Sequence, residues 1–358
     1  MAAGPAAGVQ DSRAAGSVSL LWPLYIGGLG DAVRSGFAAQ ADEAQADASA
    51  DAQGVQSLLV QRYFGAQLAE RAARLREAAL ATVREHDAAA ERMLATGVIS
   101  RLERLQAQAA LADAAQQARK ARDEAQLAAT ALARTLKVVA PQRPSSPLFV
   151  ASQPLPALQG FIDAALARHP GLSKVQAKRR EAAALHDAQE ALRKPQVLGF
   201  GLSDIRTGGG KPNWVAGVAV RWTLWDSVDR DQLAASGQRK IEQAELTEQQ
   251  ARSDIALLVE KNWLAVEHAR TQYLAQQAQE DLARELLRLR EAGQREGTGT
   301  LLEWMDARVN LAKVQTERAQ TAHQYIQALA ALLQSTGQSD AFGRYMAEAD
   351  IQIPSDAP

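Results

Sequence analysis

The feature that most limits how this chain can fold is an internal repeat, in which the second half follows the first at an offset of 200 residues. Trp22 and Trp222 lie inside similar apolar segments, and Gly97 recurs as Gly297. The same offset relates Leu102, Glu103, Ala107, Leu111 and Ala112 to Leu302, Glu303, Ala307, Leu311 and Ala312. Two unrelated Ala-rich helices would match in their alanines and in little else. We therefore expect two copies of one structural unit.

The second copy, residues 155–340, shows a complete order of elements. Apolar residues recur at helical spacing over 155–194, and Pro195 ends that pattern. Segments 197–203 and 218–224 alternate apolar with small or polar residues around a Gly-rich loop at 206–213, which predicts a β-hairpin. The proline-free stretch 229–295 predicts a helix about 100 Å long at 1.5 Å per residue. A glycine turn and a return helix to about Thr336 follow, with Gly337 as its C-cap.

The first copy, residues 1–140, repeats only the later elements. It predicts a strand at 17–25, a long helix at 31–95, a turn at Gly97 and a return helix to about Lys137. A Pro/Ser-rich linker at 141–154 joins the copies, and 341–358 is assigned as a C-terminal tail. Residues 1–16 align with the strand loop of the second copy. We therefore expect that one helix, one strand and any signal peptide are missing, and that the upstream DNA encodes a helix and a strand in frame.

Composition excludes several functional classes. Of the 358 residues, 47% are hydrophobic but only 5% are aromatic, and alanine carries much of the apolar fraction, which favours closely packed helices. A formal net charge of −1 gives no global field for nucleic acid. Cysteine is absent, which excludes disulfides and thiolate chemistry. The sequence contains no apolar run of about 18 residues, so no transmembrane helix is predicted. The N-terminus does not resemble a signal peptide.

The strands distinguish between two architectures for such long helices. Helices alone would fit an ordinary antiparallel coiled coil equally well. However, each strand is near nine residues long and has one apolar face, as membrane-spanning strands do. The aromatic residues on or beside the strands, which suit a girdle at a lipid–water boundary, are Trp22, Tyr25, Phe200, Trp214, Trp222 and Trp225. A small soluble sheet capping a helical bundle is the alternative interpretation.

The order of elements, given twice, resembles the outer-membrane efflux protein (TolC) family. The segment 296–307, EGTGTLLEWMDA, is similar to the family's pattern at a helix tip, and 96–107 resembles its first-half version. The segment 166–172, LARHPGL, resembles the family's Asn-Pro-x-Leu opening of the second half, with His169 in place of Asn. The segment 325–332 resembles its closing helix. The resemblance covers most of the chain from Ser17 to Gly337.

The resemblance implies a mainly α fold with short membrane β-strands, in which long antiparallel hairpins build an α-barrel and the strands build a β-barrel. It implies a homotrimer in outer-membrane lipid, with its helices in the periplasm, that works with a periplasmic adaptor (membrane fusion) protein and an inner-membrane pump. The tip turns that would dock the adaptor are Gly97, Val98, Ile99, Ser100, Gly297, Thr298, Gly299 and Thr300. The implied function is a passive export conduit for small molecules or proteins, in a tripartite efflux or type I secretion system.

Acidic residues near the tips are the candidate pore aperture. The resemblance places Glu303 and Asp306 where the family has its aperture acids, with Glu103 as a weaker counterpart. Three copies of each carboxylate around a threefold axis would attract cations and repel anions. The alternative is that these acids are favourable charges at a helix N-terminus.

No catalytic, metal or cofactor site is expected. The five histidines are far apart in sequence and never stand four residues from one another, so we expect solvated helix positions for them. Two other functional interpretations stay open: a periplasmic coiled-coil adaptor, and a structural scaffold without channel activity. An adaptor would need a lipoyl-like β-domain interrupted by one hairpin, whereas this chain predicts two hairpins.

Overall fold

The computed structural model describes residues 15–206, 213–223 and 229–353, which divide into two compact units. The first unit contains residues up to Ala46 together with 173–250, and the second contains 47–172 together with 251–358. Helices α1 (Leu29–Ala95), α4 (Pro170–Ala191) and α5 (Arg230–Arg295) contribute to both units. No helix among the described residues holds an apolar stretch long enough to cross a bilayer.

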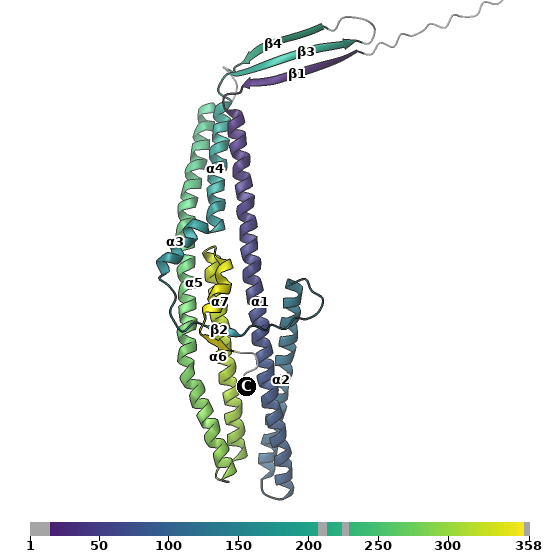
Figure 1. Cartoon of the computed structure of the whole chain (residues 1–358), viewed down its shortest axis with the longest axis vertical. Coiled ribbons are helices and arrows are strands. Elements are labelled where there is room, and N and C mark those ends of the chain that lie inside the picture. The colour runs from purple at the N-terminus through teal and green to yellow at the C-terminus, as the bar shows by residue number, and fades with distance from the viewer. Residues whose placement is uncertain (1–14, 207–212, 224–228, 354–358) are drawn as a thin grey trace, which may run out of the picture. The chain divides into compact units, whose positions relative to one another are not determined.

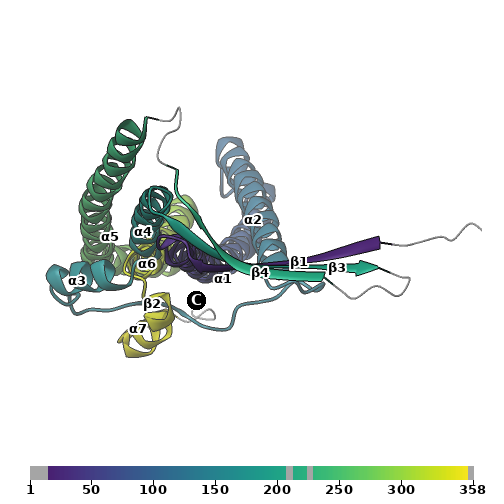
Figure 2. The same cartoon turned by 90° about the horizontal axis from the view of Figure 1, so that it is seen from above.

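The first unit is headed by a three-stranded antiparallel sheet. Its strands are β1 (Ala15–Tyr25), β3 (Gln196–Arg206) and β4 (Asn213–Arg221), in the order β1-β3-β4. Strands β3 and β4 form the hairpin predicted from the alternation, and the strand of the first copy joins its open edge. Figure 1 and Figure 2 show the three strands side by side.

The register of the sheet separates two faces. Trp22 pairs with Gly199, which pairs with Val218, so bulky residues of the outer strands flank glycine on one face. On the other face the central strand carries the bulk, because Phe200 pairs with Gly217. A Cβ on Gly217 would lie 2.9 Å from the Phe200 ring, so a side chain there would displace the aromatic ring. Large and small residues therefore alternate across the sheet.

Alanine seams hold the helices of the first unit together. Every seventh residue is a buried alanine at Ala32, Ala39 and Ala46 of α1 and at Ala177, Ala184 and Ala191 of α4. A Cβ on Gly36 of α1 would lie 3.7 Å from that of Ala184, so the two backbones approach closely. A seven-residue repeat is the pattern of coiled-coil packing, and small side chains permit a short distance between axes. Ion pairs such as Lys178 Nζ to Glu43 Oε2, at 2.6 Å, border the seam.

The second unit contains two antiparallel helical hairpins. Helix α2 (Arg101–Thr135) returns along α1, and α6 (Leu301–Ser335) returns along α5. The α1–α2 pair is called the first hairpin below and the α5–α6 pair the second hairpin. Both α2 and α6 are 35 residues long, and their first residues, Arg101 and Leu301, are 200 residues apart, as the expected repeat requires. Buried residues again recur every seven positions, at Val259, Val266, Tyr273, Glu280 and Leu287 of α5 and at Met305, Ala312, Ala319, Ile326 and Leu333 of α6.

Both segments outside the repeats help to build the main hydrophobic core. Strand β2 (Leu148–Val150) of the linker pairs antiparallel with β5 (Ile351–Ile353) of the tail. Phe149 lies at the centre, with its ring 5.7 Å from Phe64 of α1, 6.2 Å from Tyr325 of α6 and 5.8 Å from Phe342. Phe342 begins α7 (Phe342–Glu348), which follows the 3₁₀ turn η1 (Ser339–Ala341). The linker and the tail thus close one shared core.

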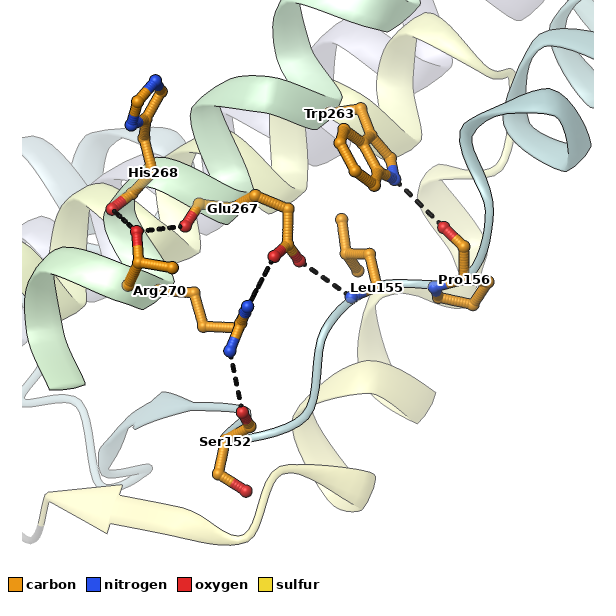
Figure 3. A network of polar contacts seen from close by, with 8 residues as sticks. Ser152, Leu155, Pro156, Trp263, Glu267, His268 and Arg270 are labelled. Atoms are coloured by element: carbon orange, nitrogen blue, oxygen red, sulfur yellow. Dashed lines mark hydrogen bonds and ion pairs between the residues drawn. The ribbon is translucent and has the colours of Figure 1, made fainter.

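Polar contacts attach the rest of the linker to the helices. Figure 3 shows Glu267 of α5 accepting the Leu155 backbone N–H at 2.8 Å, while Arg270 donates to the Ser152 carbonyl at 2.9 Å. Trp263 Nε1 donates to the Pro156 carbonyl at 3.0 Å. On α1, the Tyr63 hydroxyl accepts the backbone N–H groups of Ser145 and Ser146, each at 3.0 Å. These bonds satisfy backbone groups that no strand or helix pairs.

The single helix expected over 155–194 is wrong, because the structure has two helices there. Helix α3 (Leu158–Arg168) ends at His169, and α4 begins at Pro170. Proline forces the preceding residue out of the helical region, and His169 is extended at φ −66° and ψ 122°. Proline then suits the first position of the next helix, since its missing N–H would have no partner there.

Candidate functional site

The two hairpin tips are built in the same way. Gly97 and Gly297 follow α1 and α5 with φ of +74° and +73°, a conformation that favours glycine. At the first tip the N–H of Val98 donates to the Met93 carbonyl at 2.8 Å, and at the second Thr298 donates to Gly293 at 2.9 Å. This Schellman arrangement satisfies the last carbonyls of each helix. The chain thus reverses direction at both tips, and the docking role of these turns stays a prediction.

The tips differ in the surface that they present. Val98 is 70% exposed and Leu102, in the first turn of α2, is 65% exposed. The equivalent exposed residue of the second tip is Thr298. Ile99 and Gly299 are half-buried at matching positions, and a Cβ on Gly299 would lie 3.3 Å from the Gly293 backbone. The exposed residue of the turn is thus apolar at the first tip and polar at the second.

The carboxylates Glu103 and Glu303 act as helix caps. Ser100 and Thr300 are the N-caps of α2 and α6, and each side-chain oxygen accepts the N–H of the glutamate three residues on, at 3.2 Å. Glu103 in turn accepts the Ser100 N–H at 2.6 Å, and Glu303 accepts the Thr300 N–H at 3.3 Å. These reciprocal bonds form a capping box at each tip.

The surroundings of the acids differ between the copies. Backbone and side-chain hydrogen bonds from Ser100 hold the pKa of Glu103 below its ordinary value. Glu303 also pairs with Arg290 of α5 at 3.0 Å. Asp306 lies one turn further along α6, where it is exposed and lines a cleft of about 300 Å³ with residues of α1 and α2. The capping role is thus present, and a role in a ring of three copies remains a prediction.

A small core behind the tips was missed by the sequence analysis. Trp304 is buried among Val83, Leu287 and Met305, and its ring centroid lies 4.0 Å from that of His86. The equivalent position in the first copy is polar: Arg104 forms an ion pair with Asp87 through two hydrogen bonds. The seven-residue spacing from Trp304 to Leu311, Arg318, Tyr325 and Leu332 is the signal that could have indicated burial.

The aromatic residues predicted on the strands lie on an exposed sheet. Trp22 is 63% exposed, Trp214 75%, Trp222 57% and Tyr25 50%. Phe200 is half-buried over Gly217, as described above. Trp222 Nε1 donates to the Arg193 carbonyl at 3.2 Å, which ties the end of the sheet to the segment after α4. Trp225 lies outside the described residues.

One face of this sheet is apolar along its outer strands. Cross-strand register places Val18, Leu20 and Trp22 of β1 on the same face as Trp214, Val218 and Val220 of β4, and all six are more than half exposed. The opposite face mixes Ser17, Ser19 and Gln196 with Leu21 and Leu202. A contiguous exposed apolar face is typical of a surface that binds another protein or lipid.

The sequence predicted solvated positions for all five histidines, but the structure buries some of them. His323 is 9% exposed inside the helical core, and burial lowers its pKa. His169 is half-buried, and its Nδ1 accepts the Gly171 N–H at 3.1 Å, so it caps the first turn of α4. His268 is exposed as expected. No group of three or more potential metal ligands occurs within the described part of the chain.

Comparison with known proteins supports this arrangement. Residues 161–338 match the profile of a family described as Outer membrane efflux protein. No protein with curated annotation matches the sequence significantly. Several solved structures share the fold.

Three of these structures illustrate the likeness. A membrane protein from Pseudomonas aeruginosa superposes with a TM-score of 0.77 at 15% identity, over 91% of this chain and 84% of that one. The CmeC outer membrane channel of Campylobacter jejuni gives 0.73 at 16% identity, over 94% and 80%. The outer membrane protein VceC of Vibrio cholerae gives 0.71 at 14% identity, over 91% and 87%. At these identities the likeness establishes the fold alone.

Proposed function

The chain belongs, through residues 161–338, to the outer membrane efflux protein family, and from this we propose that it is one protomer of a homotrimeric export channel. In this proposal the protein is a passive conduit in a tripartite efflux or type I secretion system. The strands lie in outer-membrane lipid, the helices extend into the periplasm as an α-barrel, and an inner-membrane pump supplies the energy. Substrates are small molecules or proteins, and no reaction is catalysed.

The exposed apolar face of the β1-β3-β4 sheet is the observation that carries the proposal. Val18, Trp22, Trp214, Val218 and Val220 are 57% to 75% exposed. In water such a face would be a site of aggregation, whereas hydrocarbon covers it without cost. In this proposal the edges of the sheet take part in closed β-barrel pairing, which satisfies backbone groups that lipid would leave unpaired.

The hairpin tips supply the partner site in the same proposal. The turns at Gly97–Ser100 and Gly297–Thr300 meet the periplasmic adaptor. The apolar surface of Val98 and Leu102 supports a contact with an apolar patch on that partner. Glu303 and Asp306, and more weakly Glu103, surround the aperture and favour cations. Because Glu103 and Glu303 already serve as caps, Asp306 is the acid whose replacement tests ion selectivity without removing a cap.

Cell fractionation tests the location. We expect the product of the native gene to pellet with the outer membrane and to need detergent for extraction. In the matched variants, Val218→Asp places a charge on the apolar face, whereas Ser19→Asp places one on the opposite face. A charge on a lipid-facing strand is destabilising, by about 2–4 kcal/mol for Arg or Lys at the bilayer centre and by less for Asp. Only Val218→Asp should reduce the outer-membrane fraction, and a water-soluble wild-type protein would contradict the proposal.

Single-channel conductance tests the aperture. The purified trimer in a planar bilayer should prefer cations, and Asp306→Asn should reduce that preference while leaving trimer assembly unchanged. Lys313→Gln is the matched control, since Lys313 lines the same cleft as Asp306 two turns away. An adaptor or a scaffold, the alternatives that the sequence left open, would give no conductance.

A further inference from the structure

One aromatic contact joins the two hairpins of the second unit just behind their tips. His86 comes from α1 of the first hairpin and Trp304 from α6 of the second, and their ring planes meet at 59°. Trp304 is 9% exposed, and its core partners also come from both hairpins: Val83 from α1, and Leu287 and Met305 from α5 and α6. Separating the two hairpins would therefore break the contact between Trp304 and His86.

The repeat shows that a hairpin does not need this contact in order to form. At the offset of 200, Arg104 takes the place of Trp304 in the first copy and pairs with Asp87 inside its own hairpin. Leu286 takes the place of His86 in the second copy and is 37% exposed. The position of Trp304 thus closes the first hairpin by an ion pair when it holds Arg104, whereas in the second copy Trp304 reaches across to the first hairpin. The cross-hairpin contact is an addition to the common plan.

The surroundings of His86 favour its neutral form. Burial lowers the pKa of His86, and the neighbouring Glu85 opposes this shift only in part. Two ion pairs lie on residues next to this contact: Arg104 with Asp87 between α2 and α1, and Arg290 with Glu303 between α5 and α6. Trp304 Nε1 is buried without a hydrogen-bond acceptor, so the indole contributes no polar bond that would hold it in place. The packing of the two rings and of the small apolar core alone therefore holds Trp304 against His86.

We propose that His86 and Trp304 form a proton-sensitive clasp between the two hairpins of one chain. With His86 neutral, the rings pack and the second hairpin is held against the first. Protonation adds a charge in a desolvated place, where attraction to the indole face offsets only part of the lost hydration. The hairpins then separate at their tips. This goes beyond the proposed channel function, because it states which parts of the chain move and what releases them.

Distance measurement between spin labels tests the clasp in the full chain. Because the sequence has no cysteine, Val98→Cys and Thr298→Cys give one label on each tip. Labelled chain is diluted into excess unlabelled chain, so that labels on different copies do not contribute. Double electron–electron resonance is recorded at about pH 8 and about pH 5, on either side of the ordinary histidine pKa. We expect a narrow distribution at the higher pH and a broader, longer one at the lower pH.

Two variants separate the clasp from a general effect of acid. His86→Phe keeps a ring against Trp304 without a titrating group, so its distribution should stay narrow at both pH values. His268→Phe removes an exposed histidine from α5 and should behave as the wild type does. A wild-type distribution that does not change with pH, or a His86→Phe distribution that broadens in acid as the wild type does, overturns the proposal. Neither result depends on whether the protein reaches the outer membrane, so failure of the channel proposal would be recognised separately.

Discussion

At the scale of single residues, backbone conformation decides where the return helices end. Lys137 and Gly337 stand at equivalent positions after α2 and α6, and both are left-handed, with φ of 55° and 70°. The hydrogen bonds around them are the same, since Val138 donates to Ala133 at 3.0 Å and Gln338 donates to Leu333 at 2.8 Å. Gly337 was predictable as a cap because glycine marks this position. Lys137 carries no such signal, because a lysine rarely adopts this conformation.

These two positions predict opposite effects of substitution. Lys137→Gly should stabilise the protein by about 0.5–1 kcal/mol, because glycine removes the strain of a left-handed side chain. Gly337→Ala should destabilise it by more than about 1 kcal/mol, because a Cβ would also lie 2.8 Å from the Arg168 carbonyl oxygen. Chemical denaturation measures both changes. Equal effects of the same sign at the two positions would contradict the reasoning.

His169 illustrates a residue whose role only the structure reveals. Its extended backbone follows from Pro170, which the sequence shows, but the hydrogen bond from the Gly171 N–H to Nδ1 requires a particular ring orientation. Asparagine, which the related motif carries at this position, is among the best capping residues. Histidine can serve in the same way only when Nδ1 carries no proton.

Replacing His169 should therefore separate capping from titration. His169→Ala should cost about 0.5–2 kcal/mol through the lost cap, whereas His169→Asn should cost little. Burial holds the pKa of His169 below its ordinary value, so the unfolded chain takes up the proton first as the pH falls. The wild type should lose stability from about pH 6.5 downward until the folded histidine titrates.

The control for this prediction is the difference between wild type and His169→Asn across the same pH range. His86 and His323 also have lowered pKa values, so both proteins share their contribution. Urea denaturation at several pH values gives the free energy of unfolding of each protein. In acid, the difference between wild type and His169→Ala should become smaller, and His169→Asn should gain stability relative to the wild type. A pH-independent gap between wild type and His169→Asn would exclude titration of this histidine.

At the scale of elements, the seven-residue seam of α5 contains one ionic position. Glu280 stands between Tyr273 and Leu287 in the buried series, and its side chain is 7% exposed. It accepts hydrogen bonds from Arg318 of α6 and from Arg284, the latter at 2.6 Å. The Arg318 guanidinium also lies 4.4 Å from the centre of the Tyr273 ring. A buried charge in a coiled-coil seam fixes register at some expense of stability.

A double-mutant cycle at this pair should be strongly non-additive. Glu280→Leu should cost about 3–5 kcal/mol, because it leaves the Arg318 charge buried without its carboxylate. Combining it with Arg318→Leu should recover most of that loss, since two leucines can fill the seam. Thermal or urea unfolding of the two single variants and the double variant gives the coupling energy. The exposed pair Arg288–Glu285 is the matched control and should show coupling below about 1 kcal/mol.

The elements also show which parts of the fold the sequence could predict. Long helices, the hairpin of β3 and β4 and both tips were predicted, because periodicity, alternation and glycine are local signals. The pairing of β2 with β5 was not, since three residues such as Leu148–Val150 are too short to display alternation and their partner lies at the far end of the chain. For the same reason the contact between His86 and Trp304 could not be predicted, because it depends on how two hairpins meet.

At the scale of the whole molecule, the second unit brings both repeats into one core. Phe149 of β2 lies against Phe64 of the first hairpin and Tyr325 of the second, and its side chain is 1% exposed. In an array of independent repeats, each copy would contribute its own stability and the connecting segment would contribute little. Here the connecting segment supplies the central aromatic residue. The two hairpins should therefore lose structure together when this segment is disrupted.

Phe149→Ala tests that cooperativity. Removing the ring should cost about 3–5 kcal/mol, the usual range for a buried phenylalanine. Hydrogen exchange measured by mass spectrometry should show faster exchange in α1 and α2 as well as in α5 and α6 of the second unit. Leu127→Ala is the control, because Leu127 is 70% exposed on α2 and its loss should leave exchange nearly unchanged. If only the segments next to Phe149 lose protection, the hairpins are stable independently and the linker is a passive connection after all. Faster exchange throughout both hairpins would instead establish the linker and the tail as parts of the structural core.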